Sequence, residues 1–421
     1  MTKLARQLGP WAMFATLMVI LPRTFTSSFS LTVLSQTGVF IIFSCAYNML
    51  LGQGGMLSFG HAVYFGMAGY FTIHLINYFH THANLAVPLI FVPCLGGLAG
   101  LVLGVLIGYV STRRAGMTFA MISLGFGEMA TALTLVLLSF FNGDDGVHTD
   151  RVYSPQIFGL SFGSQIQIYY LIAAWCFIAT ATMFTLTLTP FGQASHAVRD
   201  NPERAEFTGY NPQRVRWLAF SLSSFFAGLA GSLHAISYEQ AGPATVGAQT
   251  SALILFMTYI GGIGSFLGPI VGATLLGTLN ANLSSYTNAW GFYLGLVFIL
   301  TVMFAPNGLA GLITMHKPLL TAGSRVLWRL VPSYVAGLGS TILTCIGTIG
   351  IVEMVYHLNS DLTKQTALTL FRLPIDAHSW IPWAACACAV AVGVLLSLRA
   401  YPWVRATWQA TMDEARRRAA G

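Results

Sequence analysis

Few residues of this chain have the type and spacing that catalysis needs. None of its three lysines follows a glycine, so the Gly-Lys-[Ser/Thr] end of a Walker A nucleotide loop is absent. No His-Glu-x-x-His sequence occurs either. Solvation in a loop explains His80-x-His82, and Cys386-x-Cys388 is too sparse for a metal site. We therefore expect no enzyme activity, and no metal or ATP bound by this chain itself.

Glu128 is the notable acid inside an apolar stretch, following Leu124-Gly-Phe-Gly. A carboxyl group within a bilayer indicates a functional site by default. Two interpretations stay open. Glu128 pairs with Arg113 or Arg114 near the cytoplasmic end of its span, or it contacts a solute or a gate. Glu353 lies near the exterior end of its span, where its side chain can reach the interface.

Composition places these residues in a membrane. Of 421 residues, 55% are hydrophobic and only 8% are charged, whereas soluble globular proteins carry about 25% charged residues. Apolar runs of spanning length recur along the chain, which predicts an all-α, polytopic membrane protein of about 10–12 spans with broken or re-entrant helices. The expected spans are 10–28, 33–51, 54–76, 86–109, 118–141, 167–188, 217–236, 251–282 (a hairpin or two short helices), 288–305, 334–357 and 381–399.

The basic residues orient the chain. Of 20 Lys and Arg, all but Arg23, Arg151, Lys364 and Arg372 fall in loops on one side. The positive-inside rule puts that side, with both termini and residues 192–216, in the cytoplasm. The formal net charge of +7 is thus a membrane signature and does not indicate nucleic-acid binding.

The longest polar interruption, residues 192–216, predicts a short helix, a turn and the start of another helix. Asn201 suits an N-cap, and Pro202 suits a first helical turn. Ala205 and Gly209 stand four apart, so we expect them on one helical face. Small residues there would offer a seat for close packing by another protein, which suggests a machine driven by a soluble partner.

Two glycine-rich breaks interrupt the apolar spans. The first, Leu51 to His61, contains Gly54, Gly55, Ser58 and His61, and the second is Gly261-Gly262-x-Gly264 before Pro269. Each break either lines a polar cavity, as broken transporter helices do, or serves packing and turning only. Further small-residue repeats, such as Gly96, Gly100, Gly104 and Gly108, predict close helix packing. Thr258 and Tyr259 are additional candidates for a polar lining.

Several stretches together resemble the LivM-type permeases of branched-chain amino acid ABC importers. They occur in the family's order and run through about three quarters of the chain. The stretches are Tyr47–Tyr70, Thr112–Glu128, Gly192–Gly209 continuing into Ala219–Ser232, Gly261–Gly272 and Ala305–Leu309.

The resemblance implies an ABC importer permease fold in the bacterial plasma (inner) membrane. It implies that residues 192–216 are the coupling loop that docks on an ATPase, with Ala205 and Gly209 at its core and Arg199, Asp200 and Glu203 beside them. It also implies partners: a second, LivH-like permease subunit, two ATP-binding subunits and an extracytoplasmic solute-binding protein. The solute would be a branched-chain or related amino acid, or alternatively urea or an aromatic acid.

A rival interpretation is an ion-coupled secondary transporter. It requires intramembrane acids for proton or sodium binding, and Glu128 is nearly the only candidate.

In the importer, the translocation pathway would be lined by Gly54, Gly55, Ser58, His61, Glu128, Thr258, Tyr259, Gly261 and Gly262.

The chain divides at about residue 315. Residues 1–315 form the expected permease domain. Residues 316–421, a linker, a two-helix membrane hairpin and a basic cytoplasmic tail, have no counterpart in the typical family member. We expect the hairpin, 334–399, to pack on the periphery with its connecting loop, about 358–380, outside.

Overall fold

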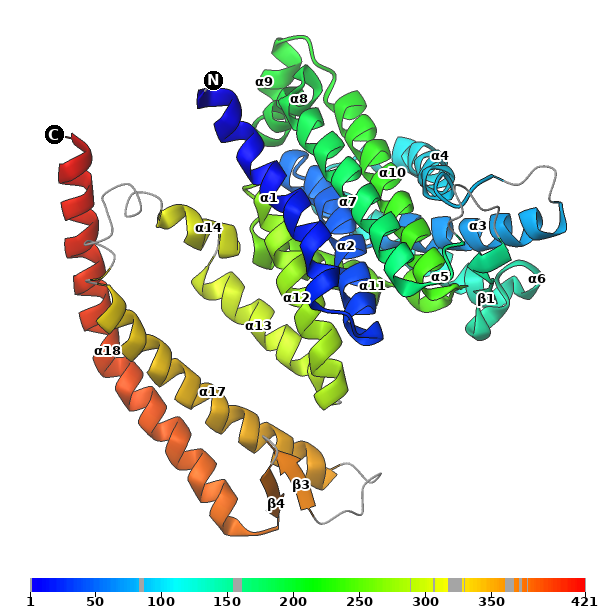
Figure 1. The fold of residues 1–421 in the computed structure, drawn as a ribbon. Helices are drawn as coiled ribbons and strands as arrows, with labels where there is room; N and C mark the ends of the chain where they lie inside the picture. Colours follow the sequence, from blue (N-terminus) through cyan, green and yellow to red (C-terminus); the bar gives the residue numbers. More distant parts are fainter. Residues whose placement is uncertain are drawn as a thin grey trace. The chain divides into compact units, whose positions relative to one another are not determined.

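Helices make up nearly all of the fold (Figure 1). The computed structural model describes residues 2–82, 87–153, 161–287, 289–305, 307–316, 328, 330–359, 367–370, 373–376 and 378–420. They form two compact units. The first unit comprises Met1–Tyr286 and Leu294–Gly311, and the second comprises Thr287–Tyr293 and Leu312–Gly421.

Eight helical stretches in the described part of the chain are long and apolar enough to cross a membrane. The chain is therefore a polytopic helical membrane protein, as its composition predicted. The eight stretches are Ser28–Gln53, Val92–Ser111, Met117–Val136, Gln165–Leu188, Pro212–Tyr238, Pro243–Gly261, Val331–Asn359 and Trp380–Glu414.

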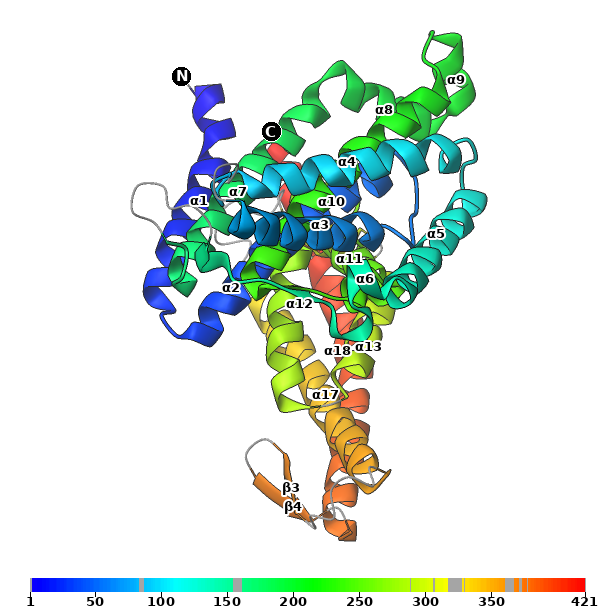
Figure 2. The ribbon, with the colours of Figure 1, turned by 90° about the vertical axis from the view of Figure 1, so that its right-hand side faces the viewer.

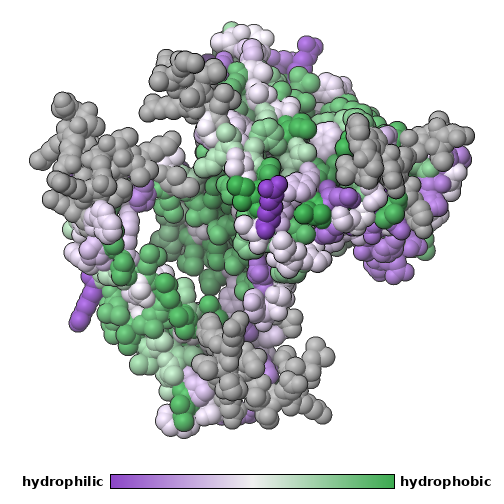
Figure 3. All heavy atoms as spheres, viewed as in Figure 1, coloured by the Kyte–Doolittle hydropathy of each residue, from purple (hydrophilic) through white to green (hydrophobic). Residues whose placement is uncertain are grey.

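Other helices overlap the remaining expected spans, but residues 54–61 of the expected span 54–76 form a loop, and the helix starts only at Ala62. The expected span 251–282 is two helices, α11 (Ala248–Gly261) and α12 (Leu267–Tyr286). Further elements are α1 (Thr2–Thr24), α3 (Ala62–Thr81), α13 (Trp290–Phe304) and α14 (Gly308–Met315). Figure 3 shows hydrophobic residues over α12 and α13, and hydrophilic residues gathered over α9 and over the region of β1 and α6.

The helix α10 (Pro212–Tyr238) packs against α2 (Ser28–Asn48), α3 and α4 (Val92–Ser111) in the first unit. The glycines of α4 make its contact with α10 close. A Cβ at Gly100 would lie 2.5 Å from the Ser224 carbonyl oxygen, and one at Gly104 would lie 2.5 Å from Ser224 Cβ. The predicted packing role of this glycine ridge is confirmed, because only small residues allow two backbones to approach this closely.

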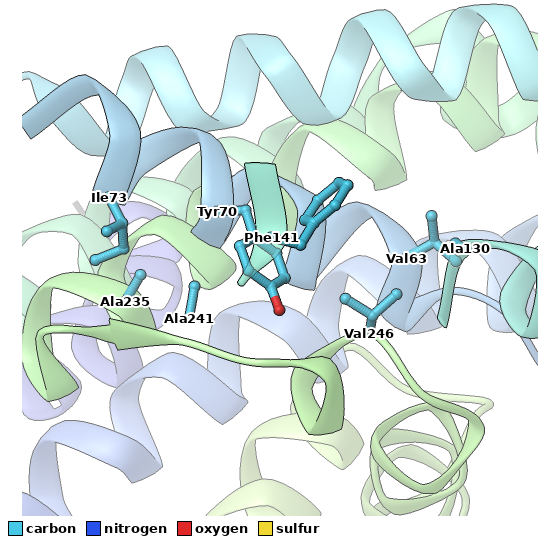
Figure 4. Packing of buried hydrophobic residues seen from close by; sticks show 8 residues of the cluster. All are labelled: Val63, Tyr70, Ile73, Ala130, Phe141, Ala235, Ala241 and Val246. Atoms are coloured by element: carbon cyan, nitrogen blue, oxygen red, sulfur yellow. The ribbon is translucent and has the colours of Figure 1, made fainter. Parts of the chain in front are cut away.

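A small apolar cluster connects α3, α5 (Met117–Val136) and α6 (Leu138–Phe141) to the loop after α10 (Figure 4). Tyr70 and Phe141 meet edge to face, with ring centroids 4.9 Å apart. The short strands β1 (Val147–His148) and β2 (Gln240–Ala241) pair antiparallel beside it. Neighbouring turns are η3 (Gly143–Asp145), η4 (Arg151–Tyr153) and η5 (Pro243–Thr245).

The second unit is built on two helices that pack against each other. Its helices are α17 (Val331–Asn359) and α18 (Trp380–Ala420), and a Cβ at Gly393 would lie 2.7 Å from the Thr344 backbone nitrogen. The strands β3 (Ala367–Leu370) and β4 (Leu373–Asp376), which the sequence did not predict, form a hairpin between them. The carboxylate of Glu353 accepts hydrogen bonds from Thr287 and Tyr293, both 2.8 Å long.

Candidate coupling and translocation site

A knob of short helices occupies residues 190–216: α8 (Pro190–Asp200), α9 (Pro202–Phe207) and the start of α10. In both ribbon views α8 and α9 project together from the first unit (Figure 2). Each of the three helices starts with a capping residue followed by proline: Thr189-Pro190, Asn201-Pro202 and Asn211-Pro212. The predicted cap is confirmed, since Asn201 Oδ1 accepts a 2.9 Å hydrogen bond from the Arg204 amide.

Ala205 and Gly209 do not share a helical face, so that prediction is wrong. The helix α9 ends at Phe207, and Gly209 follows it with φ +92°. The Gly209 amide donates to the Glu206 carbonyl and the Tyr210 amide to the Ala205 carbonyl, which is a Schellman C-cap. Ala205 is 2% exposed and packs in an apolar cluster with Ala194, Val198 and Val215. Its small side chain therefore serves the interior of the knob.

Phe207 is the residue that the knob presents to the outside. Its side chain is 92% exposed, and Tyr210 beside it is 43% exposed. Asp200 and Glu203, both predicted for the coupling loop, are also exposed. The sequence interpretation missed Phe207, although one large apolar residue within the longest polar stretch of a chain is a detectable signal. A large exposed aromatic side chain is a typical anchor for protein docking.

Arg199 points the opposite way, from the last turn of α8 toward the first break. Its guanidinium donates a hydrogen bond to the Gly52 carbonyl oxygen. The same guanidinium pairs with Asp200, at 2.8 Å from Nη2 to Oδ1. A Cβ at Gly55 would lie 2.6 Å from Arg199 Cγ, so the aliphatic part of the side chain contacts one side of that glycine. The structure thus brings together Arg199 and Gly55, which were predicted for two different functions.

His196, one turn before Arg199 in the knob, has a shifted titration. Partial burial lowers the pKa of its imidazole, and the Arg199 charge lowers this pKa further, while Asp200 opposes the shift. Folding of the knob therefore favours the neutral imidazole more than the unfolded chain does.

The first break is a buried loop between α2 and α3. The helix α2 ends in a π-helical turn, η1 (Met49–Gln53), and side chains then satisfy the loop backbone. The Phe59 amide donates to Ser123 Oγ and the Ala62 amide to Ser251 Oγ, both at 3.0 Å. Tyr47 donates its hydroxyl to the Ser58 carbonyl at 2.8 Å. Irregular backbone in a membrane protein persists where protein encloses it in this way.

The side chains of the first break that were predicted to line a polar cavity are buried in this structure. Ser58 is 1% exposed and His61 is 0% exposed. His61 Nε2 lies 2.9 Å from Ser223 Oγ, and the imidazole is surrounded by aromatic rings. These rings belong to Phe43, Tyr47, Tyr64 and Phe220. Gly54 is also buried, whereas Gly55 is exposed.

The second break is a tight turn between α11 and α12. Gly262 has φ +113°, which favours glycine, and a Cβ there would lie 2.5 Å from the Asn307 carbonyl oxygen. Gly261 packs directly on Gly268 and Gly272 of α12. Thr258 is fully buried and donates to the Ile254 carbonyl at 2.8 Å. Gly261, Gly262 and Thr258 thus lie in close packing in this conformation.

The two breaks adjoin each other. A Cβ at Gly52 would lie 2.7 Å from the Ile263 carbonyl oxygen, so the turn after α2 touches the turn after α11. Tyr259 borders an apolar pocket of about 420 Å³ next to this junction. The pocket is lined by Leu51, Leu57, Leu255, Tyr259, Phe298, Ile299, Val302 and Met303.

Glu128 lies in the middle of α5 with its side chain exposed. In the described part of the chain it forms no ion pair with Arg113 or Arg114, so the pairing interpretation is not supported. Arg113 instead lies over the Tyr109 ring, 4.7 Å from its centroid. Gly125, one turn earlier on α5, faces open space. This face of α5 is uncovered by the chain itself.

Comparison with known proteins decides the family. Residues 29–305, well over half of the chain, match the family described as branched-chain amino acid transport system / permease component. The chain belongs to this permease family. The match spans the knob and both breaks, and it ends before the second unit's hairpin.

Individual relatives agree with the family. The chain is similar to the high-affinity branched-chain amino acid transport permease LivM of Salmonella typhimurium, with 26% identity over 316 residues, covering 69% of this chain and 71% of that one. The LivM of Escherichia coli is 26% identical over 309 residues, covering 68% and 70%. A fructose import permease of Rhizobium meliloti, FrcC, is more distant, with 24% identity over 304 residues, covering 68% and 79%. These relatives are transport permeases, which are not enzymes. No solved structure matches.

Proposed function

We propose that this chain is one of two permease subunits of an ABC importer for a branched-chain or related amino acid. Two ATP-binding subunits drive it, and an extracytoplasmic binding protein delivers the solute. The observation that carries the proposal is the family match over a chain whose knob exposes Phe207. By the positive-inside rule, the basic loops place the knob and both termini on the cytoplasmic side of the bacterial inner membrane.

The knob is the proposed ATPase seat. Docking would bury Phe207, and full burial of such a side chain contributes about 1.5–3 kcal/mol. Asp200 and Glu203 would border the contact as exposed acids, with Gly209 holding the turn. Ala205 supports the seat from inside, because it packs on Val198 and Val215.

The uncovered face of α5 is the proposed wall of the translocation pathway. A carboxylate at the centre of a span is too costly to face lipid. Glu128 therefore faces an aqueous path shared with the second permease subunit, where it attracts the ammonium group of the solute. The buried candidates Ser58, His61, Thr258, Gly261 and Gly262 would join the lining, with Gly54, Gly55 and Tyr259, only when the breaks move.

The pathway proposal is testable by cysteine labelling in the assembled transporter. Glu128→Cys should react with a membrane-impermeant thiol reagent, and solute should protect it. Leu133→Cys, on another face of α5 and 42% exposed, is the matched control and should not react. An unreactive Glu128→Cys in a transporter that still works would refute the pathway face.

Residues 316–421 are proposed as an added membrane hairpin with a basic cytoplasmic tail, outside the pathway, and residues 1–315 as the permease domain. The helix α18 has 41 residues, which at 1.5 Å each is about 60 Å and twice the thickness of the hydrocarbon core. Its basic end therefore extends beyond the bilayer.

The importer class is tested by transport in proteoliposomes. The complex of both permeases and the ATPases, given binding protein and labelled leucine, should accumulate leucine only with ATP. Unlabelled urea or an aromatic acid should not compete. Uptake that follows a proton or sodium gradient without the ATPases would establish the secondary transporter instead.

A further inference from the structure

We propose that Arg199 is a positioning residue that transmits movement of the docked knob to the two breaks. This inference rests on the proposed function, because it needs an ATPase to move the knob. The importer could operate without this particular link, so the two ideas can fail separately.

The first argument is where the guanidinium binds. The carbonyl of Gly52 belongs to η1, the π-helical turn that continues α2, where the last helical carbonyls lack partners within the helix. A cation at a helix C-terminus is favourable because it meets the negative end of the helix dipole. Arg199 supplies both the donor and the charge, from 147 residues away in sequence. The end of α2 is thus capped by the knob.

The second argument is how closely the side chain fits. Gly55 has φ +65°, and a Cβ there would lie 2.6 Å from Arg199 Cγ and 3.5 Å from Arg199 Cδ. The arginine is held at its other side by Asp200, with Nε 2.9 Å from Oδ1. A side chain fixed by two hydrogen-bond partners and packed on backbone cannot follow the knob without displacing Gly52 or breaking from it.

The third argument is what lies on each side of Arg199. Toward solvent, Phe207 is two residues from buried Ala205, which packs in one cluster with Val198, the neighbour of Arg199. Toward the membrane, Gly52 touches the Ile263 carbonyl of the second break. Chain neighbours within the knob, and packing and hydrogen-bond contacts beyond it, therefore connect Phe207 through Arg199 to both breaks.

The turn η1, which holds the Gly52 carbonyl, is able to change its conformation. The turn at Met49–Gln53 is π-helical, a rare geometry that occurs mostly as single turns within helices and is frequent at functional sites. When the knob shifts, Arg199 would release or pull the Gly52 carbonyl, and the turn could rewind. The loop from Gly54 to His61 would then move relative to the second break.

The test uses the full transporter in proteoliposomes and measures assembly, ATP hydrolysis and uptake together. Arg199→Gln removes the cap, and Gly55→Ala disturbs its packing without touching the charge. Both variants should copurify with the ATPases but transport about tenfold less solute per ATP hydrolysed, the scale expected for one lost charged hydrogen bond. Arg199→Lys should recover part of the loss. Arg214→Gln, which removes an exposed charge from the same knob, is the matched control.

Each outcome decides the proposal. Solute uptake per ATP at the wild-type level in both Arg199→Gln and Gly55→Ala would overturn it, while leaving the importer function intact. Failure of Arg199→Gln to assemble, with normal coupling in Gly55→Ala, would also overturn it, because Arg199 would then serve docking only. Absence of ATP-dependent uptake in the wild-type complex would instead refute the proposed function.

Discussion

Phe207 offers the sharpest quantitative prediction about the knob. The change is Phe207→Ala, which removes a side chain that is 92% exposed. Because it lies outside the buried cluster of the knob, its removal should leave the fold of the knob unchanged. Nearly all of its surface is available for burial by a partner, so the variant should lose about 1.5–3 kcal/mol of docking free energy. That loss weakens binding about 10–150-fold.

The assay is the affinity of the purified ATPase subunit for this permease, held with its partner permease in lipid nanodiscs. Tyr210→Ala, whose side chain is 43% exposed, should show a smaller loss. Tyr286→Ala is the control: it removes a side chain that is 83% exposed but lies outside the knob. Unchanged affinity in Phe207→Ala would refute the docking argument. If the variant loses as much free energy of unfolding as it loses free energy of binding, Phe207 supports the fold instead.

Three further predictions concern other parts of the chain. Arg151→Gln should destabilise the first unit by about 1.5–3 kcal/mol, measured by thermal unfolding against Arg114→Gln, since buried Arg151 donates hydrogen bonds to the Phe162 and Ser237 carbonyls; an unchanged melting temperature would contradict this. Because folding lowers the pKa of His196, the imidazole becomes protonated at a higher pH in the unfolded knob than in the folded one. Falling pH therefore favours the unfolded knob. Resistance of the knob to proteolysis should therefore be full above about pH 6.5 and fall below it, and His196→Gln should abolish the pH dependence. Truncation after Leu312 should leave a subunit that still assembles and transports but melts at a lower temperature, because Thr287 and Tyr293 lose the Glu353 carboxylate; normal assembly without uptake would show that the hairpin takes part in transport.

Local sequence signals were sufficient to predict the helices and the start of the second helix of the knob. Apolar runs long enough for a bilayer specify spans by themselves, because every backbone group in lipid must bond within its own segment. The pair Asn201-Pro202 marked a helix start for a similarly local reason, since a cap and the first turn involve neighbouring residues. The ridge of glycines on α4 predicted close packing without naming α10 as its partner.

The site depended on contacts between residues far apart in sequence. Ala205 turned inward because α8 and α10 supply an apolar cluster for it, and Gly209 left the helix to form its C-cap. The hydrogen bond from Arg199 to Gly52 joins residues 147 apart. No period or spacing encodes such a pairing. The sequence by itself determined which segments enter the membrane and where the knob begins, because those choices follow from local composition and capping. Only the tertiary structure decided which side chains of the knob are exposed and which one hydrogen-bonds to the first break, because helix packing sets their direction.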